Sequence, residues 1–251
     1  NAFTSTGLKT VEYQGETNPF TGTAFDKTSL KFAIVPIKYS DVKFCELTSI
    51  SKGECGTECK WEYKHESKEL IITGEGNNAE IENYPRTSDS KEAPWSDKKG
   101  SITTISITGI TRIGNQAFKG WTSFTTITLP ESVKTIGQNA FEGCSGIETI
   151  ELKTVETIES NAFIGCIGLT SITIPSSIKS IGDNAFASLS GLTTVNYEGE
   201  KNPSGTCSDN AFTNSGTTFV EVKMNYAVID KTFCGLQQRT KGKCATSEEM
   251  C

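Results

Sequence analysis

Apolar residues return at a nearly constant spacing along the middle of the chain, with polar stretches between them. A phenylalanine recurs after 23, 22 and 23 residues, and an isoleucine five residues ahead of it keeps a matching spacing. These positions are Phe118, Phe141, Phe163 and Phe186, and Ile113, Ile136, Ile158 and Ile181. A period of roughly 20–29 residues is typical of a solenoid, in which stacked coils bury an apolar face that one coil cannot bury alone.

Each coil contains a run in which apolar and hydroxyl-bearing residues alternate. In FTTITLP, Ile127 and Leu129 alternate with threonines. Later coils repeat the pattern with the pairs Ile150 and Leu152, Ile172 and Ile174, and Val195 and Tyr197. A period of two predicts a half-buried β-strand, and strands that recur once per turn should pair in parallel. Pro130 and Pro175 should end two of these strands, because proline cannot donate to a ladder.

A second apolar piece and a polar corner follow each strand. The second piece carries Val133 and Ile136, then Val155 and Ile158, then Ile178 and Ile181. Asparagine precedes Ala-Phe at the corners, at Asn139, Asn161, Asn184 and Asn210. Such an asparagine predicts a cap on a short helical or 3-10 turn, or a bond to the neighbouring coil's backbone. The phenylalanine should fill the core, since its burial contributes on the order of 1.5–3 kcal/mol.

A longer duplication underlies the short one. Residues 1–19 match residues 184–203 with one gap, and residues 44–55 match residues 233–244. The chain therefore opens in the last coils of one array and runs through a second array to the same boundary. Because it begins inside a repeated phrase, we expect it to be a piece of a longer chain. The predicted units are a preceding array with its Cys-rich boundary (1–59), a β-hairpin cap and loop (60–100), the solenoid (101–233) and a second Cys-rich boundary (234–251).

The segment after Cys59 predicts a β-hairpin. In WEYKHESKELIITGEG, charged residues alternate with Trp61, Tyr63 and His65, and a second apolar run follows a polar turn. A solenoid needs terminal caps, because its last coil otherwise exposes the core. We therefore expect the hairpin to lie across the open end of the second array. The stretch 77–100 is predicted to be a loop, with Trp95 folded back onto the cap.

Composition and charge exclude several classes of function. The 251 residues include 24 basic and 30 acidic ones, which gives a formal charge of −6. A nucleic-acid-binding protein usually carries a basic face, so no nucleic-acid partner is expected. The longest apolar run, residues 32–37, is far shorter than the roughly 20 residues of a membrane helix, so no membrane insertion is expected in this segment.

Cysteines gather near both boundaries, which predicts disulfides and an oxidising compartment. The simplest pairing lies within each copy of the boundary phrase, and the candidates are Cys45 with Cys55 and Cys234 with Cys244. Pairings of Cys55 with Cys59 and of Cys207 with Cys251 stay open, because sequence alone does not give connectivity.

Two further cysteines lie inside the repeats. Cys144 and Cys166 occupy a slot that Trp121 and Leu189 fill in adjoining coils. A slot that accepts tryptophan or leucine is apolar, so the two cysteines are predicted to be buried free thiols rather than an inter-coil disulfide.

The sequence carries no catalytic constellation, so we expect a protein that is not an enzyme. The single histidine, His65, lies in the hairpin without a nucleophile motif nearby. Cys55-Gly-Thr-Glu-Cys59 lacks the second half of a zinc motif, and residues 72–78 lack the lysine of a phosphate-binding loop. No cofactor or metal is therefore expected.

The outward strand positions are the candidate binding face. They form a polar ladder across the parallel strands: Thr104, Ser106, Thr126, Thr128, Thr149, Glu151, Ser171, Thr173, Thr194 and Asn196. Threonine suits an exposed sheet face for structural reasons alone. Extended solenoid faces also bind proteins or glycans, and both interpretations stay open at this point.

The repeat IGxNAFxxCxxLxxIxIPxSVxx resembles the BspA-like (Treponema pallidum-type) leucine-rich repeat over residues 102–212 and, more weakly, 1–36. Gln116 and Glu159 depart from the pattern, at its usual asparagine and glycine. The resemblance implies a β-rich, right-handed solenoid with a parallel sheet, short helical or 3-10 turns and a hairpin cap between arrays. It also implies a non-enzymatic secreted or cell-surface protein that adheres to a protein or glycan on a cell surface or matrix. The alternative is a structural subunit of an extracellular fibre or coat, polymeric or built from tandem cap-plus-array units.

Overall fold

A computed structural model describes residues 11–14, 32–35, 43–44, 47–85, 91–222 and 232–240. Its elements are β1 (Phe32–Ile34), β2 (Lys43–Phe44), β3 (Leu47–Gly56), β4 (Cys59–Lys64), β5 (Glu69–Gly74), a 3-10 turn (Ser96–Lys98), β6 (Thr104–Thr108), β7 (Arg112–Ile113), β8 (Thr126–Thr128), β9 (Thr135–Ile136), β10 (Thr149–Glu151), β11 (Thr157–Ile158), β12 (Ser171–Ile174), β13 (Ser180–Ile181), β14 (Thr194–Tyr197), β15 (Phe219–Val222), β16 (Thr232–Phe233) and β17 (Leu236–Thr240).

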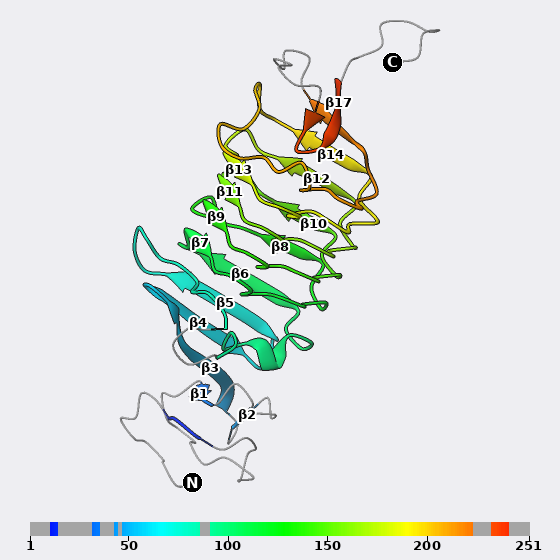
Figure 1. Cartoon of the computed structure of the whole chain (residues 1–251). Coiled ribbons are helices and arrows are strands. Elements are labelled where there is room, and N and C mark those ends of the chain that lie inside the picture. Colours follow the sequence, from blue (N-terminus) through cyan, green and yellow to red (C-terminus); the bar gives the residue numbers. More distant parts are fainter. Residues whose placement is uncertain are drawn as a thin grey trace, which may run out of the picture.

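Successive coils stack along one axis and contribute two strands each (Figure 1). The longer strands β8 and β10 pair in parallel, as do β12, β14 and β15. The short strands β7, β9, β11 and β13 form a second parallel sheet on another side of the stack. The prediction of parallel strands that recur once per coil is confirmed.

The alternating apolar residues of β8, β10, β12 and β14 point into the stack, whereas Phe219 at the start of β15 is exposed. Ile127, Ile150, Ile172 and Val195, which occupy equivalent positions in the four longer strands, are buried. Their alternation with exposed hydroxyl residues matches the predicted period of two. One continuous hydrophobic cluster runs from Cys55 to Leu236, which is what a solenoid core requires because each coil covers its neighbour.

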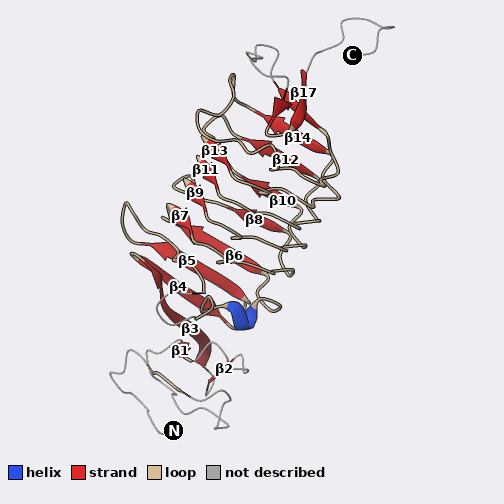
Figure 2. Cartoon of the chain, viewed as in Figure 1, coloured by secondary structure: helices blue, strands red, loops and turns tan. Residues whose placement is uncertain are grey.

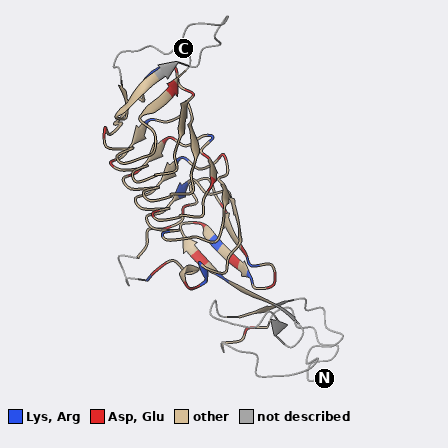
Figure 3. Cartoon of the chain, turned by 90° about the vertical axis from the view of Figure 1, so that its right-hand side faces the viewer, with Lys and Arg blue, Asp and Glu red and all other residues tan. Residues whose placement is uncertain are grey.

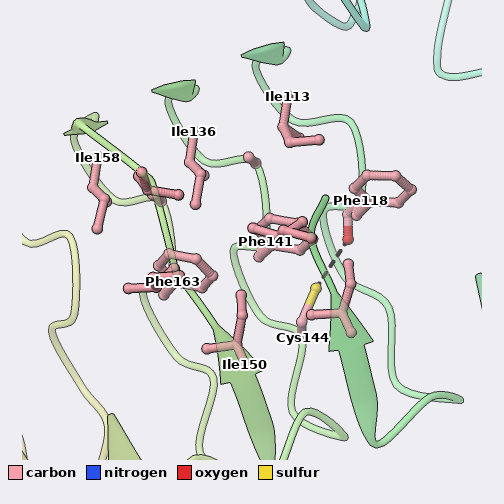
Figure 4. Packing of buried hydrophobic residues seen from close by; sticks show 14 of the residues in the cluster. Ile113, Phe118, Ile136, Phe141, Cys144, Ile150, Ile158 and Phe163 are labelled. Carbon is pink, nitrogen blue, oxygen red and sulfur yellow. Dashed lines mark hydrogen bonds between the residues drawn. The ribbon is translucent and has the colours of Figure 1, made fainter. Parts of the chain in front are cut away.

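The recurring phenylalanines form a single buried column, of which Figure 4 shows Phe118, Phe141 and Phe163. Ring centroids along the column are 5.3, 5.2, 5.3 and 5.1 Å apart, and the rings are nearly parallel. The column consists of Phe118, Phe141, Phe163, Phe186 and Phe212. Trp95 stacks on its N-terminal end, 5.7 Å from Phe118, so the predicted column exists and is longer than its four predicted members.

The corners that precede the phenylalanines are turns, not short helices, in the described part of the chain (Figure 2). Asn139, Asn161 and Asn184 adopt φ values of 57°, 58° and 55°. Asparagine tolerates this left-handed region better than most residues. The predicted role as a helix cap is therefore wrong for these three residues, and their backbone conformation accounts for the asparagine. Gln116, which departs from the pattern, has a φ of 56° at the same corner.

Changing Asn161 to Ala should lower the free energy of unfolding by about 1–2 kcal/mol, because alanine keeps the Cβ that clashes in the left-handed region and lacks the polar side chain with which asparagine offsets that clash by local hydrogen bonds. Asn161→Gly should cost less, since glycine adopts positive φ readily. Urea denaturation followed by circular dichroism compares the two variants. Equal losses for alanine and glycine would contradict this account and assign the effect to the amide side chain.

The segment after Cys59 forms the predicted hairpin, but its position differs from the prediction. Strands β4 and β5 pair antiparallel, and β5 pairs in parallel with β6 from Glu69 and Thr104 onward. The hairpin therefore lies in the plane of the sheet and does not cross the open end of the array. The in-plane position follows from the sequence of β5, whose Leu70 and Ile72 face the same core as the β6 residues.

The stretch after the hairpin is not an irregular loop over its first half. Ile81 donates its backbone N–H to Arg112 O and Tyr84 donates to Asn115 O, at 3.0 and 2.8 Å. Ala79, Ile81 and Tyr84 are buried, so this polar-looking stretch lies beside β7 as part of a coil. The prediction for Trp95 is confirmed, because it is fully buried, contacts Trp61 edge-on and donates its indole N–H to Ala117 O at 2.9 Å.

The C-terminal end of the array is closed by the small β16–β17 hairpin. Strand β17 pairs in parallel with β15, and Phe233 packs on Tyr197 with centroids 4.5 Å apart. The tight turn contains Gly235 at a φ of 85°. A Cβ at Gly235 would lie 2.1 Å from Asp209 O, so only glycine lets the turn approach the last coil this closely.

Candidate functional site

The outward strand residues lie in two rows across the longer strands. The pairing register sets Thr126 beside Thr149 and Thr128 beside Glu151. The same arrangement sets Ser171 beside Thr194 and Thr173 beside Asn196. By equivalent position in successive coils, one row contains Thr104, Thr126, Thr149, Ser171 and Thr194, and the other contains Ser106, Thr128, Glu151, Thr173 and Asn196. We call these ten residues the hydroxyl face. Among the described strands, backbone pairing joins β8 to β10 and β12 to β14, but not β6 to β8 or β10 to β12.

Most of the hydroxyl face is open to solvent. Six members are exposed on β8, β10 and β12, together with Thr104 on β6, while Ser106, Thr194 and Asn196 are half-buried. Thr149 Oγ1 donates to Thr126 Oγ1 at 3.3 Å, so neighbouring hydroxyls are close enough to bond along a row. The sequence-predicted residues are thus brought to one side of the stack, where they can offer hydrogen-bond donors and acceptors at strand spacing.

The two rows continue onto the hairpin, which the sequence did not indicate as part of the same face. The register places Glu69 beside Thr104 and Ile71 beside Ser106. Ser106 Oγ donates to Glu69 Oε1 at 3.1 Å, and Lys64 Nζ pairs with Glu69 at 3.0 Å. The face therefore changes from charged on β4 and β5 to hydroxyl-rich on the coils (Figure 3).

A hollow of about 520 Å³ lies where the hairpin meets the preceding strands. Its lining includes Ile34, Glu54, Lys60, Glu62 and Ile71. Lys60 Nζ pairs with Glu75 at 2.6 Å, and both side chains are half exposed. The alternating charges along β4 can be read from the sequence. The hollow could not be predicted from that run alone, because residues of β3 also line it.

The repeat geometry agrees with a comparison of the chain with known families. Residues 97–218 match the family model described as BspA type Leucine rich repeat region, in six copies. This stretch is a BspA-type leucine-rich repeat region. No curated protein matches the chain.

Several solved leucine-rich repeat proteins are similar in fold. A leucine-rich repeat protein from Eubacterium ventriosum has a TM-score of 0.48 and 17% identity, over 71% of this chain and 39% of that protein. The T. pallidum Leucine Rich Repeat protein has a TM-score of 0.42 and 24% identity, over 67% and 71%. A leucine rich cell surface protein from Faecalibacterium prausnitzii has a TM-score of 0.45 and 23% identity, over 69% and 49%. The chain spans less than half the length of the first and third of these proteins.

The cysteines inside the BspA-type repeats are buried free thiols, as predicted. Cys144 Sγ donates to Phe118 O at 3.0 Å (Figure 4). Cys166 Sγ donates to Phe141 O, also at 3.0 Å. Each thiol thus bonds the carbonyl of the phenylalanine one coil earlier. A hydrogen bond with Cys144, together with burial, raises the pKa of Cys166 far above its ordinary value, so this thiol is poorly reactive.

The predicted disulfide pairing at the array boundaries is wrong for the cysteines that the structure describes. Cys55 bonds Cys59, with Cα atoms 5.1 Å apart, and Cys234 bonds Cys207, with Cα atoms 5.0 Å apart. The first pair joins the ends of β3 and β4 across their turn. The second pair anchors the β16–β17 turn to the coil that it covers.

The first of these bonds was left open by the sequence, whereas Cys207 with Cys234 was not considered. The reason is that this bond depends on how the β16–β17 turn packs against a coil 27 residues earlier. The remaining partners in the predicted scheme, Cys45, Cys244 and Cys251, lie outside the described residues.

The single histidine has a serine neighbour but no access for a substrate. Ser51 Oγ lies 2.8 Å from His65 Nε2, which is the spacing of a serine and its general base. Ser51 is only 1% exposed and His65 7%. The pair therefore belongs to the packed interior between β3 and β4.

The departure at Glu159 from the glycine of the repeat has a structural explanation. Arg112 Nη1 pairs with Glu159 Oε1 at 2.7 Å, and Glu159 Oε2 accepts the backbone N–H of Gln138 at 3.0 Å. Three successive coils are joined by this one carboxylate. The ion pair is partly buried and runs along the side of the short-strand sheet, away from the hydroxyl face.

Within the described ranges, no group of three or more histidine, cysteine or acidic side chains is arranged to hold a metal ion. The same ranges contain no helix with the length and apolar character that a membrane span needs.

Proposed function

We propose that this chain is part of a non-enzymatic secreted or cell-surface protein that binds a protein or glycan through the hydroxyl face. In this proposal the coils wind right-handed, as parallel strands with crossovers almost always do, and the β4–β5 hairpin serves as the cap between two arrays. The BspA-type repeats of residues 97–218 support the proposal, because leucine-rich repeat families are generally non-enzymatic binding proteins.

One observation carries the proposal: the ten polar residues of the hydroxyl face occupy equivalent outward positions in successive coils over a solid core, in register within the β8–β10 and β12–β14 pairs. The core beneath is filled by the aromatic column and the strand side chains, so a ligand must bind on the outside. Hydroxyl rows offer donors and acceptors to sugar hydroxyls or to a partner's backbone. Solenoid surfaces of this kind are extended enough to contact a large partner.

The experiment changes Thr126, Thr128, Thr149 and Thr173 together to Lys and measures binding to a glycan array and to a panel of immobilised matrix proteins. We expect binding to fall at least about tenfold, because four long cations replace the hydroxyls at the centre of the face. The matched control introduces four lysines at exposed hydroxyl residues outside the two rows, at Thr122, Ser190, Thr206 and Thr213. Equal binding by the two variants would exclude the hydroxyl face as the site.

A second candidate function is structural, in a fibre or coat of tandem cap-plus-array units. The observation that favours it is strand β3, which pairs in parallel with β1 and antiparallel with β4. Two arrays joined by a shared strand would form a stiff unit. Negative-stain electron microscopy tests this candidate: filaments with an axial repeat of one array support it, and compact single particles at high concentration contradict it.

A further inference from the structure

The two ends of the array carry the same three-strand arrangement. Phe44 pairs with Leu47 between β2 and β3, and Phe233 pairs with Leu236 between β16 and β17. On the other side, β3 and β17 each pair in parallel with a preceding strand, β1 and β15. The sequence duplication is therefore also a duplication of strand order and register, with β17 as the copy of β3.

The N-terminal copy continues further than the C-terminal one in the described part of the chain. After its short pairing with β2, strand β3 pairs antiparallel with β4 from Ile50 and Lys64 to Gly56 and Cys59. Strand β5 then connects β4 to β6, the first strand of the next coils. For β17, the corresponding edge beyond Gln237 carries no paired strand among the described residues.

Backbone directions identify which groups of β17 face that edge. Gln237 donates its N–H to Thr218 O, so its backbone faces the β15 side. Because backbone groups alternate along a strand, Gln238 and Thr240 face the opposite edge. In the N-terminal copy, the residue equivalent to Gln238 is Ser49, and Ser49 O accepts the N–H of His65 next to β4.

We propose that β17 is an acceptor strand for an antiparallel strand with the chemistry of β4, supplied by the cap hairpin of a following array of the same kind. The proposal rests on the second candidate function and specifies how arrays join: by one uninterrupted sheet through a shared strand. The added strand carries aromatic residues at every second position, and these face the core as Trp61 and Tyr63 of β4 do. Main-chain hydrogen bonds to Gln238 and Thr240 hold it, which is the mode of β-strand addition.

The test uses a tandem protein in which the full chain, residues 1–251, is followed directly by residues 60–251 of its own sequence. Cys251 then precedes Lys60, as Cys59 does in the first copy. Hydrogen exchange is measured at the Thr240 amide in the tandem protein and in the single chain. We expect exchange to slow on the order of 100-fold or more in the tandem protein, because the amide enters a ladder. An equal rate in both proteins would overturn the proposal.

A proline variant adds a second readout. Thr240→Pro removes the N–H that faces the open edge and leaves the bonds to β15, so the single chain should keep its melting temperature. In the tandem protein, T240P should replace a single inter-array angle in electron micrographs by a wide spread of angles. Thr240→Val keeps the N–H and should keep the single angle. A fixed angle in T240P would contradict the acceptor role, and neither result depends on ligand binding by the hydroxyl face.

Discussion

Replacing Phe163 by Ala should lower the free energy of unfolding by about 3–5 kcal/mol, which is the usual cost of removing a buried aromatic ring from a core. Phe163 lies in the middle of the aromatic column, with ring centroids of Phe141 and Phe186 at 5.2 and 5.3 Å. Both neighbours lose a stacking partner, and the coils above and below cannot close the cavity without breaking their backbone register. Equilibrium urea denaturation followed by circular dichroism measures the loss.

A control for this variant is available in the next corner. Ile167 is 53% exposed, so Ile167→Ala removes apolar atoms from the surface rather than from the core and should change stability by less than about 0.5 kcal/mol. A loss below about 1 kcal/mol for Phe163→Ala, or similar losses for the two variants, would contradict a continuous core that depends on the column.

Replacing Trp95 by Ala should cost a similar amount, about 3–5 kcal/mol, and should act on the N-terminal end of the array. Trp95 is fully buried, stacks on Phe118 and touches Trp61 and Tyr84 edge-on. Its removal opens the end of the column to water. Hydrogen exchange should therefore rise most in the first coils, around residues 112–118, and least in the last coils.

The Trp95→Phe variant separates stacking from hydrogen bonding. It keeps an aromatic ring over Phe118 but loses the indole N–H that Ala117 O accepts at 2.9 Å. A buried acceptor without its donor costs about 1–3 kcal/mol, so this variant should lie between wild type and Trp95→Ala. If Trp95→Phe were as unstable as Trp95→Ala, the hydrogen bond rather than the stack would hold the end of the column.

The repeated part of the fold could be predicted from the sequence because the same pattern of apolar and polar positions recurs in each coil. The constant spacing of Phe118, Phe141 and Phe163 indicates that each coil contributes one phenylalanine to the core. The alternation of apolar and polar residues around Ile127 indicates a strand with one face toward the core. Both inferences depend only on local period and on burial. The right-handed winding of the coils stays a prediction, and so does ligand binding by the hydroxyl face.

The boundaries could not be predicted in the same way, because their structure depends on contacts between distant residues. Residues 79–84 look polar and irregular, yet their backbone pairs with residues 111–115. Cys234 bonds Cys207 only because the turn at Gly235 packs closely on Asp209. The corner asparagines were predicted to cap a short helical turn or to bond the neighbouring coil's backbone. Side-chain capping and left-handed backbone favour the same residue type, so only the φ angles distinguish capping from the observed conformation.

The hydrogen bonds between coils have a consequence for resistance to proteolysis. Phe141 and Phe163 each donate their backbone N–H to the following coil, in addition to the pairing on the two sheets. A protease that cut the exposed corner at Ile167 would break one covalent link and leave the aromatic stack and these bonds in place. We expect the two fragments to stay associated and to run as a single species until a denaturant separates them.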